Sequence, residues 1–140
     1  MIRTYQNEDL PQLLELISRN IPKYFDASEK KDYQDYLTSK REDYFVFEKD
    51  EHIIGAAGIN YFPTEKTARL SWDMIDPAFQ GQGIGKQLVF YRLNHIQKAT
   101  DYRQVIVRTS QLAEKFYAKF GFQTERVEKD YWAKGFDLFL

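Results

Sequence analysis

Three alternating glycines, Gly81, Gly83 and Gly85, most restrict the folds open to this chain. They lie between an apolar, strand-like segment at 67–75 and a helical pattern that begins near residue 83. At such a junction backbone N–H groups and the helix dipole attract anionic phosphate, and the missing side chains let it approach closely. The segment therefore predicts a phosphate-binding loop, with packing glycines in a flexible loop as the structural alternative.

The remaining elements are expected on both sides of this loop. Before it we expect a strand at 2–5, two helices, and a hairpin with strands at 44–48 and 52–61. After it we expect a helix from about 83 to 99, a strand at 105–109, a second helix that Ser110 can cap, and closing strands at 122–127 and 136–139.

The order of these elements predicts the fold class. Two strands are each followed by a glycine-punctuated helix, which makes a βαβα unit with neighbouring parallel strands and right-handed crossovers. The hairpins make the rest of the sheet antiparallel. We expect an α/β (α+β) fold, with a mixed, mostly antiparallel sheet, a parallel strand pair at the cofactor cleft and about four flanking helices. The length of 140 residues suits a single domain over 1–140.

Spacing separates three kinds of phosphate-binding loop. A P-loop needs glycine at position 80 and Ser or Thr at 87, and both positions hold glutamine. A dinucleotide fingerprint needs glycine at 86, where Lys86 stands, and an acidic residue at the end of the next strand, which 105–109 lacks.

The pattern that remains is Gln-x-x-Gly-x-Gly, at Gln80, Gly83 and Gly85, and it resembles the acetyl-CoA loop of the GNAT superfamily of N-acetyltransferases. In that family a hydrophobic strand ends in a proline turn just before the loop, as 72–77 does here. A Phe-Tyr-x-x-x-Gly-Phe signature often follows about thirty residues later, as at 116–122. The resemblance implies a small, single-domain bacterial enzyme of the GNAT fold that transfers the acetyl group of acetyl-CoA to an amine.

The same resemblance implies which residues bind the cofactor. Strand backbone would pair with the pantetheine arm, loop amides would hold the pyrophosphate, and a lysine charge would lie nearby. Two polar residues, Thr109 and Ser110, stand where the family often has a cofactor contact, frequently Asn; capping a helix is the alternative role of Ser110. The full set expected is Met74, Ile75, Gln80, Gly81, Gln82, Gly83, Ile84, Gly85, Lys86, Thr109, Ser110 and Phe116.

Acyl transfer to an amine needs an uncharged nucleophile, donors for the developing oxyanion and an acid for the leaving thiolate. The resemblance makes Tyr117 the general acid, although its spacing with Phe116 and Phe120 would also suit a buried aromatic residue. Asp73, an acid between Trp72 and Met74, is a candidate general base on the acceptor side of the cleft. A water relay would serve equally, so catalysis does not require a dedicated base.

Aromatic residues make up 16% of the chain, which favours an aromatic-walled pocket for a small organic ligand as well as a filled core. The candidates for the acceptor wall are Tyr24, Phe25, Tyr33 and Tyr36, with core packing as the alternative for each. The acids Asp26, Glu29, Asp32 and Asp35 either attract a cationic amine or form a solvated helix face.

Charge and composition exclude several partners. The net charge of −1, with acids and bases mixed, offers no footprint for nucleic acid or an anionic membrane surface. The absence of cysteine excludes a disulfide framework, a thiolate metal site and a cysteine-bound acetyl intermediate. His52 and His95 lack ligand-like partners, so we expect no metal. We expect a cytoplasmic monomer or homodimer that binds neither nucleic acid nor membrane.

The leading functional hypothesis is therefore an N-acetyltransferase in which an amine attacks acetyl-CoA directly in a ternary complex. The acceptor is a small-molecule or peptide amine, including a lysine side chain. The alternative is a non-catalytic sensor module that binds acyl-CoA, and a third interpretation places a different nucleotide in the glycine loop.

Overall fold

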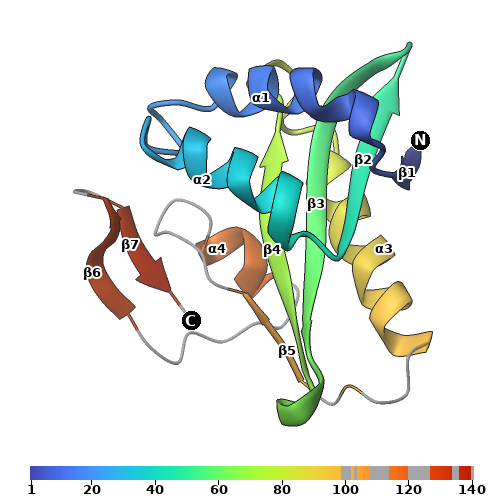
Figure 1. Cartoon of the computed structure of the whole chain (residues 1–140), viewed down its shortest axis with the longest axis vertical. Coiled ribbons are helices and arrows are strands. Elements are labelled where there is room, and N and C mark those ends of the chain that lie inside the picture. Colours follow the sequence, from blue (N-terminus) through green and yellow to red (C-terminus); the bar gives the residue numbers. More distant parts are fainter. Residues whose placement is uncertain (99–101, 103, 108–113, 120–126, 134–135, 140) are drawn as a thin grey trace.

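A five-stranded mixed sheet forms the centre of the computed structural model, which describes residues 1–98, 102, 104–107, 114–119, 127–133 and 136–139. Its strands follow the order β1 (Ile2–Thr4), β2 (Asp43–Lys49), β3 (His52–Phe62), β4 (Thr67–Ile75) and β5 (Gln104–Val107) (Figure 1). Neighbours from β1 to β4 are antiparallel, whereas β4 and β5 are parallel. The expected mixed sheet with one parallel pair is confirmed.

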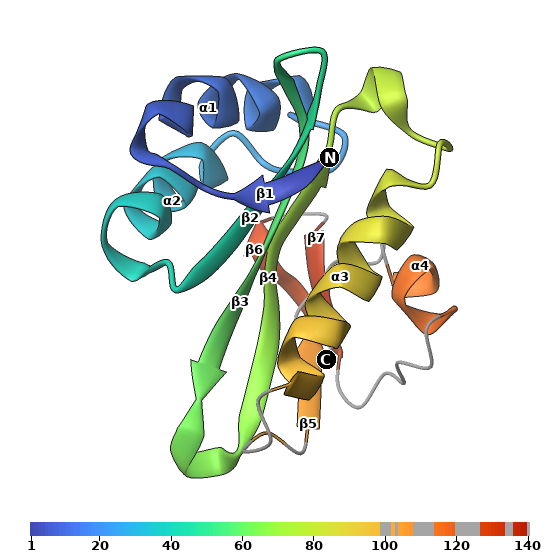
Figure 2. The same cartoon turned by 90° about the vertical axis from the view of Figure 1, so that its right-hand side faces the viewer.

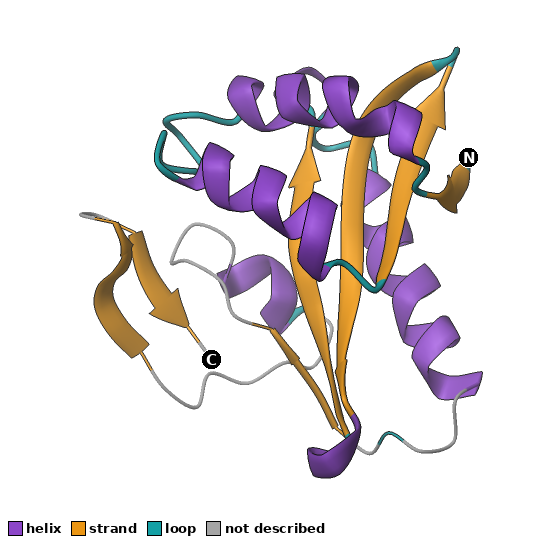
Figure 3. Cartoon of the chain, in the orientation of Figure 1, coloured by secondary structure: helices purple, strands orange, loops and turns teal. Residues whose placement is uncertain are grey.

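Helices cover both faces of this sheet. On one face lie α1 (Leu10–Arg19) and α2 (Glu29–Asp35), and a π-helical turn at Tyr36–Lys40 extends α2. On the other face lie α3 (Ile84–Lys98) and α4 (Glu114–Ala118) (Figure 2). Coloured by secondary structure, the chain shows helices in front of the strands and behind them (Figure 3). No helix within the described ranges is both long enough and apolar enough to span a membrane.

Each face of the sheet has its own apolar core. The helical spacing of Leu13, Leu16 and Ile17 in α1 places all three against the sheet, where they are buried. On the opposite face Leu88, Val89 and Ile96 of α3 are buried, as their spacing predicts. The candidate functional site lies along β4, between these two cores.

The closing strands differ from the sequence-based expectation. β6 (Val127–Ala133) and β7 (Phe136–Phe139) pair with each other in a separate two-stranded sheet. The strand predicted at 122–127 overlaps the described residues only at Val127, because residues 122–126 lie outside them, and residues 128–133 form a strand that was not predicted.

A bulge interrupts β4 next to the glycine loop. Ala56 pairs with Met74, and Gly58 pairs with Ser71. Two steps along β3 therefore correspond to three steps along β4. The extra residue coincides with Trp72, whose φ of 51° lies in the left-handed region that bulky side chains rarely adopt. A bulge of this kind changes the direction in which neighbouring side chains point.

Aromatic side chains hold the bulge from the α1/α2 side. The Tyr44 hydroxyl donates to the Trp72 carbonyl at 2.8 Å, and the Tyr33 hydroxyl lies 2.7 Å from that of Tyr44. Because Tyr44 has a single proton and gives it to the carbonyl, Tyr33 is the donor between the two phenols. The rings of Tyr33 and Tyr36 lie 5.0 and 6.0 Å from Trp72, centroid to centroid.

Gly58 creates the space for this arrangement. It pairs with Tyr44 across β2 and β3, and a Cβ atom at Gly58 would lie 2.4 Å from Cδ1 of that ring. Tyr44 supports the bulge, so a side chain at position 58 would displace the group that holds Trp72.

We expect Gly58→Ala to destabilise the protein by about 2 kcal/mol, the usual magnitude for overpacking a core, and to lower the melting temperature by several degrees. Gly55→Ala in the same strand is the matched control, because a Cβ there would meet the methyl ends of Ile84 and Ile75 at 3.1 and 3.2 Å, which can yield. Equal losses in thermal melts of the two variants would contradict this role of Gly58.

Candidate functional site

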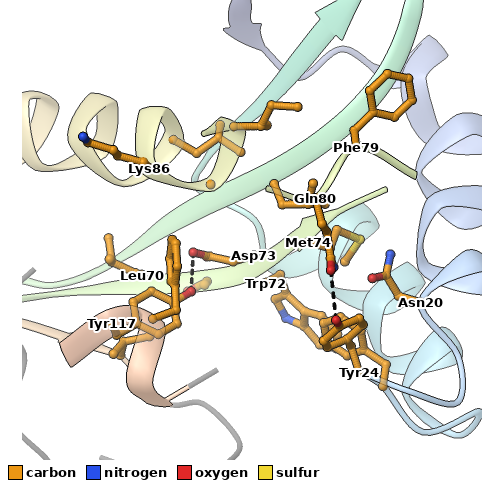
Figure 4. A pocket seen from close by; sticks show the side chains of 18 of the residues that line it. Asn20, Tyr24, Leu70, Trp72, Asp73, Met74, Phe79, Gln80, Lys86 and Tyr117 are labelled. Carbon is orange, nitrogen blue, oxygen red and sulfur yellow. Dashed lines mark hydrogen bonds between the residues drawn. The ribbon is translucent and has the colours of Figure 1, made fainter. Parts of the chain in front are cut away.

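A cavity of about 610 Å³ opens along β4. Its walls come from β4 between Arg69 and Ile75, from the loop and first helical turn between Phe79 and Lys86, and from the first residues of α2 and the segment before it. Val107 of β5 and two aromatic residues of α4 complete the lining (Figure 4). The structure thus brings the glycine loop, the bulged strand and both candidate catalytic residues around one space.

The cavity follows an edge of β4. Within the described residues the parallel pairing with β5 extends from Thr67 to Leu70, whereas β4 itself continues to Ile75 along the cavity. Met74 and Ile75 pair with Ala56 and Gly55 of β3 on the other edge. Backbone polar groups of this part of β4 can therefore pair with an extended ligand in the cavity.

The glycine loop has the conformation that close phosphate approach requires. Gly81 and Gly83 have φ values of 83° and 81°, and no atom lies within 4 Å of the position that a Cβ would take at either. α3 begins at Ile84, so the N–H groups of its first turn lack intrahelical acceptors and can bind an anion. These features fit a pyrophosphate group.

The other loop residues divide into two groups. Gln80, Ile84 and Lys86 line the cavity, whereas Gln82 is exposed and is not among the lining residues. Gly85 serves packing, because a Cβ there would lie 3.1 Å from Cζ of Phe116 on α4. The expected cofactor contacts at Thr109 and Ser110 lie outside the described residues.

Tyr117 and Asp73 meet at the cavity wall. The buried Tyr117 hydroxyl donates a hydrogen bond to the Asp73 carboxylate (Figure 4). Burial raises the pKa of Tyr117 well above its ordinary value, and the Asp73 charge adds to this effect. The Arg92 guanidinium opposes it, but the net direction keeps the phenol protonated at neutral pH.

Arg92 is the residue of the site that the sequence analysis missed. It is fully buried in α3, and two of its N–H groups bind Asp73 Oδ1 and Oδ2 at 2.6 and 2.5 Å. The spacing of Arg92 in the sequence indicates that it is buried, because it lies four residues after Leu88 and four before Ile96 on the apolar face of the helix. A charge at such a position needs a buried partner.

The four acceptor-wall candidates separate into two pairs. Tyr24 and Phe25 line the cavity, and Phe25 stacks on Trp72 with a centroid distance of 6.1 Å and an interplanar angle of 16°. The Tyr24 hydroxyl donates to Gln80 Oε1 at 2.9 Å (Figure 4). Tyr33 and Tyr36 lie in the core behind Trp72 instead of lining the cavity, so they support its wall.

One acid of the run at 26–35 enters the cavity wall. Glu29 is buried, and its carboxylate accepts a hydrogen bond of 2.7 Å from the Asp26 N–H in the turn before α2. Burial raises the pKa of Glu29. Asp32 and Asp35 are exposed, as expected for a solvated face.

Comparison with known proteins agrees with this geometry. The acetyltransferase (GNAT) domain model matches residues 3–139. A protein of Bacillus subtilis (strain 168), provisionally named [ribosomal protein bS18]-alanine N-acetyltransferase, is 27% identical over 136 residues, which cover 94% of this chain and 85% of the relative.

Two solved structures share the fold. An acetyltransferase of Desulfovibrio desulfuricans assigned to the GNAT family has a TM-score of 0.82 at 22% identity, with 99% of this chain and 94% of that chain covered. The ribosomal-protein-S18-alanine N-acetyltransferase of Escherichia coli has a TM-score of 0.80 at 16% identity, with 99% and 89% covered. At these identities the similarity describes the fold alone.

The loop geometry predicts the effect of Gly83 variants on acetyl-CoA binding. In the unchanged protein the cofactor at about a hundred times its dissociation constant should add roughly 2.7 kcal/mol of stability, or several degrees in a thermal melt. Gly83→Val should abolish this shift, because its side chain strains the left-handed backbone and fills the open space.

Gly83→Asn separates the two causes, since asparagine tolerates this backbone conformation but still adds a side chain. We expect Gly83→Asn to melt close to the unchanged protein without cofactor and to show a reduced shift with it. A full shift in both variants would exclude this loop as the phosphate site.

Proposed function

Because the chain belongs to the GNAT family of acetyltransferases, we propose that it transfers the acetyl group of acetyl-CoA to an amine that attacks directly in a ternary complex. The observation that carries this proposal is the common cavity. The glycine loop and first turn of α3, which suit a phosphate, and the Tyr117 hydroxyl, which can move a proton, face the same space.

The cofactor end of the cavity is proposed to lie at the start of α3. Backbone N–H groups between Gly81 and Lys86 would hold the pyrophosphate, with Lys86 as a nearby positive charge at the cavity wall (Figure 4). Met74 and Ile75 would pair with the pantetheine arm along the β4 edge. Acetyl-CoA supplies an activated acyl group, and an N–H of this strand would stabilise the charge that develops on its carbonyl oxygen.

Tyr117 is the proposed general acid. Its raised pKa keeps the hydroxyl protonated in the neutral range, so a proton is present when the thiolate leaves. The free protein directs this proton to Asp73, so the hydroxyl must turn toward the sulfur during the reaction. The amine loses one proton when its nitrogen bonds to the acetyl carbon, and that proton restores Tyr117, directly or through water.

Asp73 is a proposed base with a structural limitation. Two Arg92 N–H groups and the Tyr117 hydroxyl already bind its carboxylate, so accepting the amine proton would require the loss of at least one of these contacts. A water molecule that passes the first proton of the ammonium group to solvent, before the attack, avoids this cost. We therefore propose water as the route for the amine proton, with Asp73 as the base only where one of these contacts is lost.

The acceptor end is proposed to lie between Asp73 and α2. Phe25 and Tyr24 provide an apolar wall, and Glu29 adds a buried carboxyl group. The name of the Bacillus subtilis relative specifies an alanine N-terminus as acceptor. We propose a primary amine that is cationic before deprotonation, on a peptide N-terminus or a small molecule.

The direct test is release of the free CoA thiol from acetyl-CoA in the presence of a panel of amines. The panel should contain peptides that begin with alanine, the same peptides with a blocked N-terminus, lysine peptides and small polyamines. We expect thiol release with at least one free amine and none with its blocked form. Acetyl-CoA binding without release for any amine would instead identify an acyl-CoA sensor.

Tyr117→Phe tests the general acid, because it keeps the ring and deletes the hydroxyl. General acid catalysis is typically worth about a hundredfold to ten-thousandfold, so acetyl transfer should fall within that range while the dissociation constant for acetyl-CoA changes little. Near-normal turnover with the best acceptor would reduce Tyr117 to a packing residue. Tyr61→Phe is the matched control, since it deletes a part-buried hydroxyl that bonds Asp43 outside the cavity and should leave acetyl transfer intact.

A further inference from the structure

We propose that Arg92 and Asp73 are positioning residues for Tyr117: Arg92 fixes the Asp73 carboxylate, and Asp73 holds the Tyr117 hydroxyl at the cavity wall with its proton directed at the carboxylate. The inference rests on the proposed function in one respect, namely that Tyr117 transfers a proton during acetyl transfer. The three residues come from α3, β4 and α4, so the network joins elements that are far apart in sequence.

The guanidinium group of Arg92 makes four hydrogen bonds. Its Nε donates to the Leu88 carbonyl at 3.1 Å, and its Nη1 donates to the Gly58 carbonyl at 3.1 Å and to Asp73 at 2.6 Å. Its Nη2 donates to Asp73 at 2.5 Å. These four hydrogen bonds use most of the five donors of a guanidinium group and fix its plane, so the two N–H groups that face Asp73 have a defined direction.

Asp73 connects this fixed cation to the cavity. Its side chain is 22% exposed, whereas the side chain of Arg92 is inaccessible to solvent. The bulge sends Trp72 into the core beneath α1 and α2 while Asp73 reaches the α3 side, where it binds Arg92 and Tyr117. An unpaired buried cation is strongly destabilising, which gives Asp73 a structural role as well.

The two charges act on Tyr117 in opposite directions. Asp73 raises the pKa of the phenol through its charge and hydrogen bond, and Arg92 lowers it. A carboxylate without the guanidinium would orient the hydroxyl but would make it a weaker acid. Paired, the two side chains orient the hydroxyl, and the charge of Arg92 opposes the effect of Asp73 on the pKa of Tyr117. The ion pair therefore suits a residue that must first retain a proton and then give it to a thiolate.

The variants that test this network are Asp73→Asn, Arg92→Gln and the double variant. Each single change leaves one charge without its partner, so both should lower the melting temperature, Asp73→Asn more because the remaining cation is buried. The double variant removes both charges and keeps amide groups of similar shape, so it should recover much of the stability. The control is the double variant Arg3→Gln/Asp9→Asn. It also removes an ion pair, with an N–O distance of 2.8 Å, but neither residue lines the cavity.

The first readout is the ionisation of Tyr117 in the free protein, followed by NMR of tyrosine labelled with ¹³C at Cζ and assigned with Tyr117→Phe. We expect Asp73→Asn to lower the pKa of Tyr117 and Arg92→Gln to raise it. This measurement needs neither cofactor nor acceptor. Titration curves of Tyr117 that do not change in either single variant would overturn the network.

The second readout is turnover with the best acceptor of the panel. The folded double variant should lose about a hundredfold or more in kcat with little change in the KM for acetyl-CoA, and addition of Tyr117→Phe should cost little further, because the three residues act as a unit. A folded double variant with normal kcat would overturn the positioning role. If no amine is acetylated by the unchanged protein, the proposed function fails, and this outcome is distinct because it leaves the titrations unaffected.

Discussion

The left-handed backbone of Trp72 is the constraint on which the site depends. A regular β4 would alternate its side chains between the two faces of the sheet without interruption. The bulge changes this alternation next to the cavity, so the indole packs among the aromatic rings on one side and the following carboxylate meets Arg92 and Tyr117 on the other. The same distortion lies just beyond Leu70, the last residue of β4 that pairs with β5 within the described residues, at the edge of the cavity.

Such a conformation costs about 1 to 3 kcal/mol, and the surrounding packing is large enough to offset it. Aromatic pairs contribute roughly 0.5–1.5 kcal/mol each beyond their buried area, and Trp72 packs against three rings, those of Phe25, Tyr33 and Tyr36. The hydrogen bond from Tyr44 to the Trp72 carbonyl adds about 1 kcal/mol. Four aromatic residues thus support one strained residue, and only one of the four, Phe25, lines the cavity.

Local patterns predicted the elements well, because each depends on residues close in sequence. The bounds of β4, the position of the glycine loop and the inward face of α3 follow from periodicity and turn residues. The roles of Arg92 and Gly58 depend instead on a register shift between β3 and β4, which no periodicity reveals. Gly85 shows the same limit: within one motif, two glycines adopt left-handed conformations and the third makes room for Phe116, a contact set by the distant α4.

Charge along the cavity matches two substrates of opposite sign. Lys86 and the first turn of α3 supply positive potential where a pyrophosphate would bind. Asp73 cannot supply a matching negative potential by itself, because the buried Arg92 largely neutralises it. Glu29 lines the cavity at its end next to α2. Its Oε2 atom accepts from the Asp26 N–H, and the charge of the carboxylate can act on an arriving ammonium group. Burial raises the pKa of Glu29, and a cationic ligand nearby would oppose this effect by favouring the ionised form.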